Sequence, residues 1–354
     1  MPLIELLPEI YVPAFELKVG NAPLDPEATN SILEVSVTEH LDPPNQFSFR
    51  MNDPTLKFID RREGRFTEGT RVEVSLGYRG KTTLMMVGEI TALAADFPSS
   101  GPATLEVEGF DLLHAATRGT TSRVFGGPGP DTALSDSEVV KQIASDMQLD
   151  PKVDQTPSRT EPWIQDNVTN LEMLENIARA SGFFLWVDGK TLYFKQNPPA
   201  PTRVKLRWGQ NLLSFTPRLT TAGRVNAFEV RAWDYVQKQA IKGRAERSGA
   251  SLSASGEHQV RSGAGGRSER VIWRDHGIRS AVEAQAYADR LLADQEQGAL
   301  SSSGSSVGRT DIRAGSILEL SGIGRFSGDY QVEEVTHRIG EGGYQTSFQV
   351  RSLA

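Results

Sequence analysis

The segment from Ser321 to Ser352 constrains the fold more than any other part of this sequence. Large apolar and small residues alternate with polar ones on both sides of a glycine-rich turn at positions 340, 342 and 343. The patterned positions before the turn are Phe326, Gly328, Tyr330 and Val332, followed by Val335 and His337, and those after it are Tyr344, Thr346, Phe348 and Val350. A period of two is typical of strands that bury one face. The segment therefore predicts a β-hairpin, and it carries no pattern of catalytic residues.

The composition agrees with a mainly β chain. With 354 residues, of which 38% are hydrophobic and 33 are glycine, the chain has the size of two or three domains and the turn content of a β protein. There is no cysteine, which excludes disulfides, thiolate zinc sites and cysteine nucleophiles and fits a reducing cytoplasm.

Targeting signals are not expected either. The amino terminus has no basic residue before Lys18, and no apolar run approaches the roughly 18 residues of a membrane span. The net charge of −7 argues against a surface that coats nucleic acid.

Three regions differ in their patterns. Residues 1–118 contain five alternating stretches separated by turns, which predict a small β-barrel. Residues 119–200 contain two capping boxes, Ser135 with Glu138 and Thr169 with Glu172, each followed by a helical apolar face. An apolar strand, an Asp188-Gly189 turn and a second strand then predict a hairpin. This region is expected to form a small α/β domain.

Residues 201–354 predict a second β-barrel with two interruptions. The first, about 236–270, is rich in glycine, serine and basic residues and is expected to be a flexible loop. It could be a phosphate-binding arm, but it has no aromatic stacking platform, so a solvated excursion is the favoured interpretation. The second interruption is a helix over about 280–297, opened by Ser280 and Glu283 with capping-box spacing.

The closing hairpin also carries a family resemblance. The spacing Phe-x-Gly-x-Tyr-x-Val-x-x-Val-x-His, followed by Gly-Tyr-x-Thr-x-Phe, resembles the late control D family of phage tail hub proteins. Gly109-Phe110-Asp111 and Asn167-x-Thr169 are similar to segments of that family, and the order of regions agrees over essentially the whole chain. The resemblance implies a structural role for eight hairpin residues: Phe326, Gly328, Tyr330, Val332, His337, Tyr344, Thr346 and Phe348.

The resemblance also implies an architecture and a function. The chain is expected to be mainly β with an α+β insert, to contain two tube-like barrels, and to assemble as a homotrimeric ring in the bacterial cytoplasm. Such a ring is the baseplate hub of a phage tail or contractile injection particle, similar to the front of type VI secretion spike proteins. Its six similar domains would adapt a sixfold tail tube to a threefold spike.

The same resemblance implies the partners. The expected ones are the tail tube protein, a spike protein and other baseplate proteins, with no membrane and no specific nucleic acid among them. The spike is expected to be a separate protein, because type VI spike proteins continue into a needle domain whereas this sequence stops at Ala354.

The alternative classes are a tail-associated cell-wall hydrolase and a small-ligand-binding β protein. The glycines of Gly77–Thr82 lack the spacing of a phosphate loop, and those of Gly322–Gly328 lack that of a dinucleotide site. The five histidines are scattered, without the i, i+4 pair of a helical metal site: His40, His114, His258, His276 and His337. A hydrolase could still draw paired acids from distant segments. We predict no catalytic residue, no cofactor and no metal site.

Overall fold

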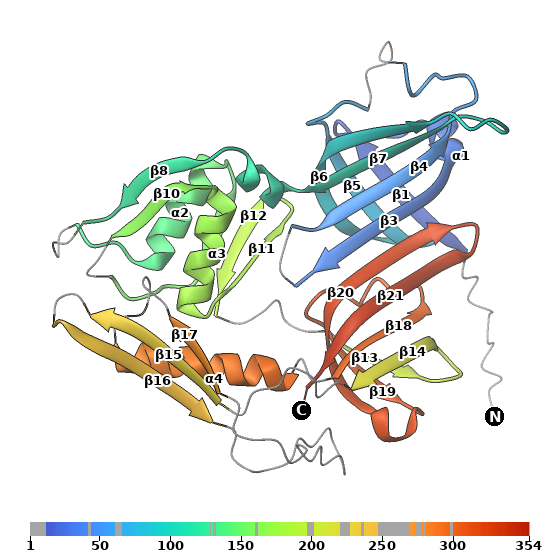
Figure 1. The fold of residues 1–354 in the computed structure, drawn as a ribbon. Coiled ribbons are helices and arrows are strands. Elements are labelled where there is room, and N and C mark those ends of the chain that lie inside the picture. The colour runs from blue at the N-terminus through green and yellow to red at the C-terminus, as the bar shows by residue number, and fades with distance from the viewer. Residues whose placement is uncertain are drawn as a thin grey trace, which may run out of the picture. The chain divides into compact units, whose positions relative to one another are not determined.

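A computed structural model describes residues 12–41, 44–60, 66–127, 129, 132–159, 162–196, 202–219, 227–234, 237–246, 269–273, 278, 280–297 and 300–353. The chain divides into two compact units. Unit 1 comprises Met1–Pro201, Val307–Gly315 and Glu334–Ser347, and unit 2 comprises Thr202–Ser306, Ser316–Glu333 and Phe348–Ala354. Figure 1 shows the elements of both units along the chain.

Unit 1 is built on a large antiparallel sheet. Its strands are β1 (Pro13–Val19), β2 (Ala22–Pro23), β3 (Ile32–His40), β4 (Gln46–Asn52), β5 (Arg71–Tyr78), β6 (Lys81–Asp96) and β7 (Thr104–Asp111), with α1 (Pro26–Ser31) between β2 and β3. They pair in the order β3-β4-β7-β6-β5-β1-β2. The far half of β20 (Gly328–Gly340) adds a strand beside β3, with His337 opposite Val37 and Ile339 opposite Val35.

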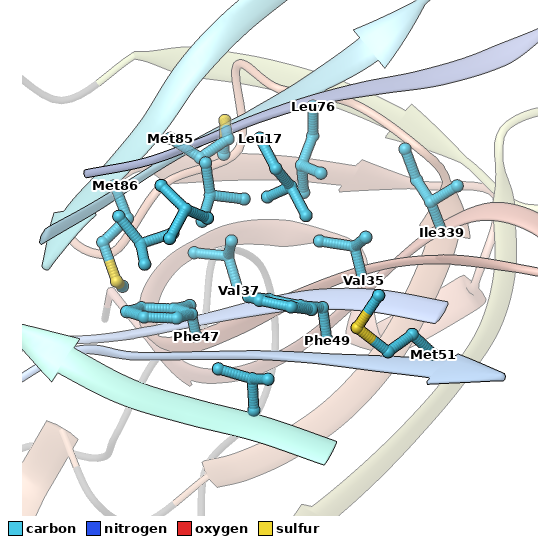
Figure 2. Packing of buried hydrophobic residues seen from close by; sticks show 14 of the residues in the cluster. Leu17, Val35, Val37, Phe47, Phe49, Met51, Leu76, Met85, Met86 and Ile339 are labelled. Atoms are coloured by element: carbon cyan, nitrogen blue, oxygen red, sulfur yellow. The ribbon is translucent and has the colours of Figure 1, made fainter. Parts of the chain in front are cut away.

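Alternation along these strands produces the core of unit 1. Phe47, Phe49 and Met51 of β4 are fully buried, as are Val35 and Val37 of β3. Figure 2 shows these side chains packed with residues of β1, β5 and β6 and with Ile339 of the closing hairpin. Truncating a buried phenylalanine of this kind to alanine typically costs about 3–5 kcal/mol. Ile339 and Tyr344 of the closing hairpin therefore belong to the core of the amino-terminal sheet.

A set of helices and strands within unit 1, which we call the α/β domain, has its own hydrophobic core. Its elements are η2 (Leu112–Thr117), β8 (Thr121–Phe125), α2 (Asp136–Asp146), β9 (Asp150–Val153), β10 (Trp163–Val168), α3 (Asn170–Ser181), β11 (Phe184–Asp188) and β12 (Thr191–Lys195). Both predicted capping boxes are formed, and Gly182 ends α3 in the left-handed conformation. The predicted hairpin pairs Asp188 with Thr191.

Unit 2 contains two sets of strands. The larger set comprises β13 (Arg203–Arg207), β14 (Leu212–Leu219), β18 (Leu300–Val307), β19 (Ile317–Ser321) and the parts of β20 and β21 (Gly343–Ser352) nearest the ends of the hairpin, with η3 (Gly324–Phe326) before β20. The smaller set has the order β16-β15-β17: β15 (Ala227–Asp234), β16 (Gln239–Glu246) and β17 (Glu269–Trp273). Its inner face packs on α4 (Ala281–Gln297) through Val230, Ile241, Ala284 and Ala288.

The structure corrects the expected loop over about 236–270. Its first part is strand β16, in which Ile241, Gly243 and Ala245 face inward. A search for large apolar residues misses this strand, because two of the three buried positions are glycine and alanine. Residues 247–268, the greater part of the expected loop, lie outside the described residues.

Two expectations about the second barrel also need correction. Phe326 lies in η3 and precedes the strand that it was expected to begin. Residues 307–315 and 334–347 belong to unit 1, so region 201–354 does not form one domain. The described strands pair along an open path, and no ladder among them closes a barrel. No helix among the described residues is long and apolar enough to span a membrane.

Candidate functional site

The eight signature residues fall into two groups along the closing hairpin. His337, Tyr344 and Thr346 lie in unit 1, where the hairpin turn is located. The other five, Phe326, Gly328, Tyr330, Val332 and Phe348, lie in unit 2. The structure therefore does not bring all eight together, and each group has a separate structural role.

The unit 1 group is a buried polar cluster. The Nε2 atom of His337 lies 2.9 Å from the carbonyl oxygen of Ile312, and a carbonyl only accepts, so Nε2 carries the proton. In the neutral ring Nδ1 is then an acceptor, 3.0 Å from the Tyr344 hydroxyl and 3.2 Å from the Thr346 hydroxyl. His337 and Thr346 have no solvent exposure. The hydrogen bonds fix the tautomer and the orientation of the imidazole.

Burial also fixes the charge of this cluster. It lowers the pKa of His337 from 6.5 to about 3, and the nearby Arg313 guanidinium acts in the same direction. The Ile312 carbonyl and Asp311 act against this shift. Burial likewise raises the pKa of Tyr344. The cluster is therefore neutral at neutral pH, and both ring nitrogens of its histidine are hydrogen-bonded to groups of the same chain.

The segment Val307–Gly315 lies against this cluster and is held to unit 1 by side chains far away in the sequence. Arg313 forms an ion pair with Glu39, with Nε 2.6 Å from Oε1, and donates to the Met85 carbonyl at 2.9 Å. Glu39 is buried, with 5% of its surface exposed. The Arg309 N–H donates to the Thr346 hydroxyl at 3.0 Å. We call Val307–Gly315 the anchored segment.

Gly308 is required where the anchored segment meets Tyr344. A Cβ atom at this position would lie 2.0 Å from Cγ of the Tyr344 ring, so no side chain fits. The Gly308 carbonyl accepts a hydrogen bond from the Tyr78 hydroxyl at 2.9 Å, and the centroids of the Tyr78 and Tyr344 rings are 5.5 Å apart. Sequence inspection singled out Tyr344 but missed Gly308, Arg313 and Glu39.

Within the unit 2 group, the buried Tyr330 contacts Phe326 and also Phe215 of β14. Its hydroxyl donates to the Phe326 carbonyl at 2.6 Å, and its ring meets the Phe215 ring edge-on at 5.4 Å. Gly328 pairs with Leu320 and has a φ of 155°, a conformation that side chains disfavour. The group closes the base of the hairpin onto β19 and onto Phe215 of β14.

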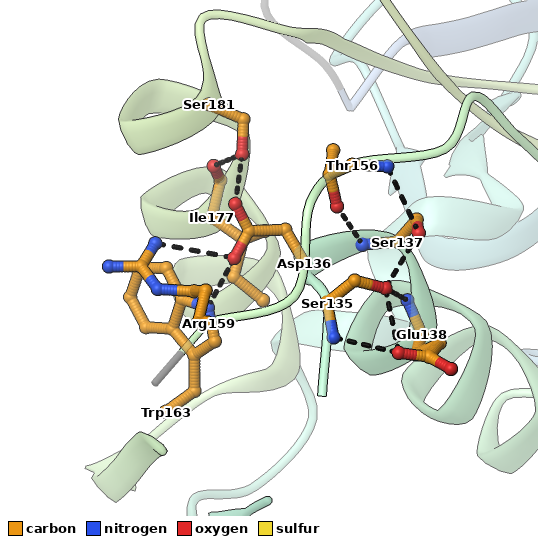
Figure 3. Close-up of polar contacts among 9 residues, drawn as sticks. All are labelled: Ser135, Asp136, Ser137, Glu138, Thr156, Arg159, Trp163, Ile177 and Ser181. Carbon is orange, nitrogen blue, oxygen red and sulfur yellow. Dashed lines mark hydrogen bonds and ion pairs between the residues drawn. The ribbon is translucent and has the colours of Figure 1, made fainter. Parts of the chain in front are cut away.

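A third network stabilises the α/β domain (Figure 3). Asp136, at the start of α2, accepts from the Trp163 Nε1 atom at 2.7 Å, the Ser181 hydroxyl at 2.7 Å and Arg159 at 3.2 Å. The Arg159 guanidinium also lies 4.5 Å from the centre of the Trp163 ring. One carboxylate thus connects α2, α3 and β10, and its three donors satisfy it as a structural group.

The hydrogen bonds of these three arrangements are made within the chain itself. In the described part of the chain, no group of three or more histidine, cysteine, aspartate or glutamate residues could hold a metal ion. The strongly shifted groups, such as His337 and Asp111, are enclosed by their own backbone partners. The predicted Gly77–Thr82 turn joins β5 to β6 and opens no helix, as a phosphate loop would require.

Comparison with protein families and solved structures shows which proteins this chain resembles. The family model described as the Alg8 N-terminal domain matches residues 16–341. The chain belongs to the Alg8 N-terminal domain family. No curated protein sequence matches it significantly.

The solved structures with a similar fold include two tail proteins and a type VI secretion component. The 43 kDa tail protein of prophage MuSo2 from Shewanella oneidensis has a TM-score of 0.74 at 13% identity, covering 96% of this chain and 98% of that one. The tail protein from Neisseria meningitidis MC58 has a TM-score of 0.71 at 15% identity, covering 97% of each chain. The E. coli c3393 protein, described as a type VI secretion component similar to T4 bacteriophage tail proteins gp27 and gp5, has a TM-score of 0.59 at 12% identity, covering 96% and 77%.

At these identities the likeness is one of fold. This family member has the fold of phage tail proteins over nearly its whole length, and the resemblance predicted from the closing hairpin is confirmed at that level. It is mainly β, as expected, and contains a large antiparallel sheet.

Proposed function

We propose that this protein is a structural hub in the baseplate of a phage tail or contractile injection particle. The observation that carries the proposal is the reciprocal coverage with two tail proteins: nearly all of this chain corresponds to nearly all of theirs.

The closing hairpin supports a structural role. Its two strands supply one part of the sheet in unit 1 and another in unit 2, and its buried His337 and Thr346 are hydrogen-bonded to the anchored segment. Interior positions with satisfied, neutral groups rigidify a scaffold, whereas a catalytic group must reach a substrate.

The proposed assembly is a homotrimer that joins the tail tube to the spike, together with other baseplate proteins. Three copies, each with two tube-like units, would present six similar surfaces to a sixfold tube and three to a spike. Closed rings of this kind arise from head-to-tail contacts between identical subunits. The similarity to a type VI secretion component supports a spike as one partner.

Light scattering on the purified full chain, alone and mixed with the candidate spike protein, tests this proposal. We expect a mass of three chains in at least one of the two samples. A stable monomer in both would refute the hub assignment. The rival hydrolase function has its own readout, because release of muropeptides by the pure protein, abolished by a single Asp or Glu change, would establish an enzyme.

A further inference from the structure

Two neighbouring turns of unit 2 form a small exposed surface. Strands β13 and β19 run in parallel, with Arg207 opposite Ser321, so the turns that follow them leave the sheet at the same end. The Trp208 N–H donates to the Ser321 carbonyl at 3.0 Å and joins the first turn to the second. We call residues 207–211 and 321–327 the paired turns.

The paired turns are stabilised by hydrogen bonds of their own. The Asn211 side chain accepts from the Arg207 N–H at 2.7 Å and donates to the Lys205 carbonyl at 3.1 Å. In the second turn, the Ser327 N–H donates to the Gly324 carbonyl at 3.0 Å. A surface that is already ordered loses little conformational freedom when a partner binds, so the paired turns are preorganised for docking.

Trp208 extends from this ordered surface into solvent. Its side chain is 51% exposed, compared with 44% for Trp233 in β15. The paired turns lie inside two stretches that are described without a gap, 202–219 and 300–353, so no undescribed residue adjoins them along the chain. Tryptophan is among the residues that contribute most to binding when a partner protein covers them. Trp208 is therefore a candidate anchor for such a partner.

The paired turns are also positively charged. They contain Arg207 and Arg325 and no aspartate or glutamate. Both arginines are exposed, and neither forms an ion pair with a described residue. The acids on either side of the second turn, Glu319 and Asp329, are already paired with basic residues earlier in β13. Two positive charges therefore remain beside Trp208.

These features define the chemistry of a partner. It must offer carboxylates to the two arginines and an apolar pocket to the tryptophan, a combination found in protein interfaces. A nucleic acid would also offer negative charge, but the net charge of −7 on the whole chain repels a polyanion. An acidic protein surface is the better match.

The number of these surfaces indicates which protein that is. Each chain has one set of paired turns, so the proposed trimer presents three of them. Three identical sites match a threefold spike, whereas a sixfold tube would need six. We infer that the paired turns dock the spike protein on an acidic patch with an apolar pocket, and that Trp208 anchors this contact. The inference rests on the proposed hub function and deepens it by assigning the surface that binds the spike.

Binding of the full chain to the candidate spike protein, measured by surface plasmon resonance, tests this assignment. W208A should raise the Kd about 30-fold, the effect of losing a binding hot spot. The control W233A removes the other exposed tryptophan of unit 2 and should change the Kd by less than about twofold. R207E combined with R325E should raise the Kd about tenfold and weaken its salt dependence, because salt screens attraction between unlike charges.

Thermal melting shows whether each variant is folded. If W208A does not fold, the two arginine reversals test the surface without it, because both side chains are exposed. An unchanged Kd for W208A and for the double reversal would overturn the docking surface and leave the hub function standing. A change in the mass of the W208A chain alone, seen by light scattering, would assign the surface to contacts between copies and overturn the spike assignment. A wild-type chain that stays monomeric and does not bind the spike would overturn both.

Discussion

Replacing His337 with glutamine should change the pH dependence of stability in a calculable way. The H337Q variant keeps a polar side chain of similar length at this position, but an amide cannot titrate. In the folded chain the His337 pKa is about 3, because the ring is buried, whereas in the unfolded chain it is about 6.5. The unfolded state therefore binds more protons between these two values, and the folded state loses stability as the pH falls through this window.

The magnitude follows from the two pKa values. At pH 7 the ring is mostly neutral in both states, and the penalty is a few tenths of a kcal/mol. At pH 5 the unfolded histidine is almost fully protonated while the folded one is not, which costs about 2 kcal/mol. Other groups titrate in the same range, and Asp111, whose pKa burial raises to about 6, has the opposite effect. These groups are common to both proteins and cancel in the difference.

Urea unfolding of both proteins at pH 7 and pH 5, followed through the transition of unit 1, measures that difference. The wild type should lose about 2 kcal/mol more than H337Q on acidification. Equal losses would refute the conclusion that His337 is buried and neutral. If H337Q does not fold, NMR of histidine-labelled wild type gives the same answer, because the His337 signal should not titrate between about pH 7.5 and 5.

Three further predictions concern packing and charge. G308A should destabilise unit 1 by about 1–3 kcal/mol, because the added Cβ overlaps the Tyr344 ring. The control G342A, in the open hairpin turn, should change stability by less than about 0.5 kcal/mol. Equal urea midpoints for the two variants would contradict this packing. R313M should destabilise unit 1 by about 2 kcal/mol, because the buried Glu39 carboxylate loses its ion pair with Arg313. Adding E39Q should recover part of this loss, and a double-mutant cycle measures the coupling energy between the two residues. G328W should lower the stability of unit 2 by about 1–3 kcal/mol because of its φ of 155°, and an unchanged melting temperature would refute this strain.

Local signals in the sequence predicted much of the secondary structure. Both capping boxes of the α/β domain formed as expected, because a capping box is an interaction between residues three apart. The β11–β12 hairpin and the closing hairpin followed from alternation and turn residues for the same reason. Strand β16 was missed where alternation was carried by glycine and alanine.

Tertiary structure decided what the closing hairpin does. The sequence showed two residues, Glu333 and Glu334, between the buried positions Val332 and Val335, and the boundary between the two units falls between these glutamates. Alternation alone did not indicate that residues before this point pair with β19 and those after it with β3. The second of these pairings depends on a strand almost 300 residues earlier in the chain.

The sequence by itself thus determined the capped helices, the β11–β12 hairpin and the closing hairpin, and its hairpin motif predicted the fold that the chain shares with phage tail proteins. The contacts of the anchored segment, such as Arg313 with Glu39 and Gly308 with Tyr344, were determined only in the folded chain. Their residues are ordinary in sequence, since an arginine, a glutamate or a glycine is common on any surface. Burial and close approach, which arise only when distant segments pack together, give them their roles.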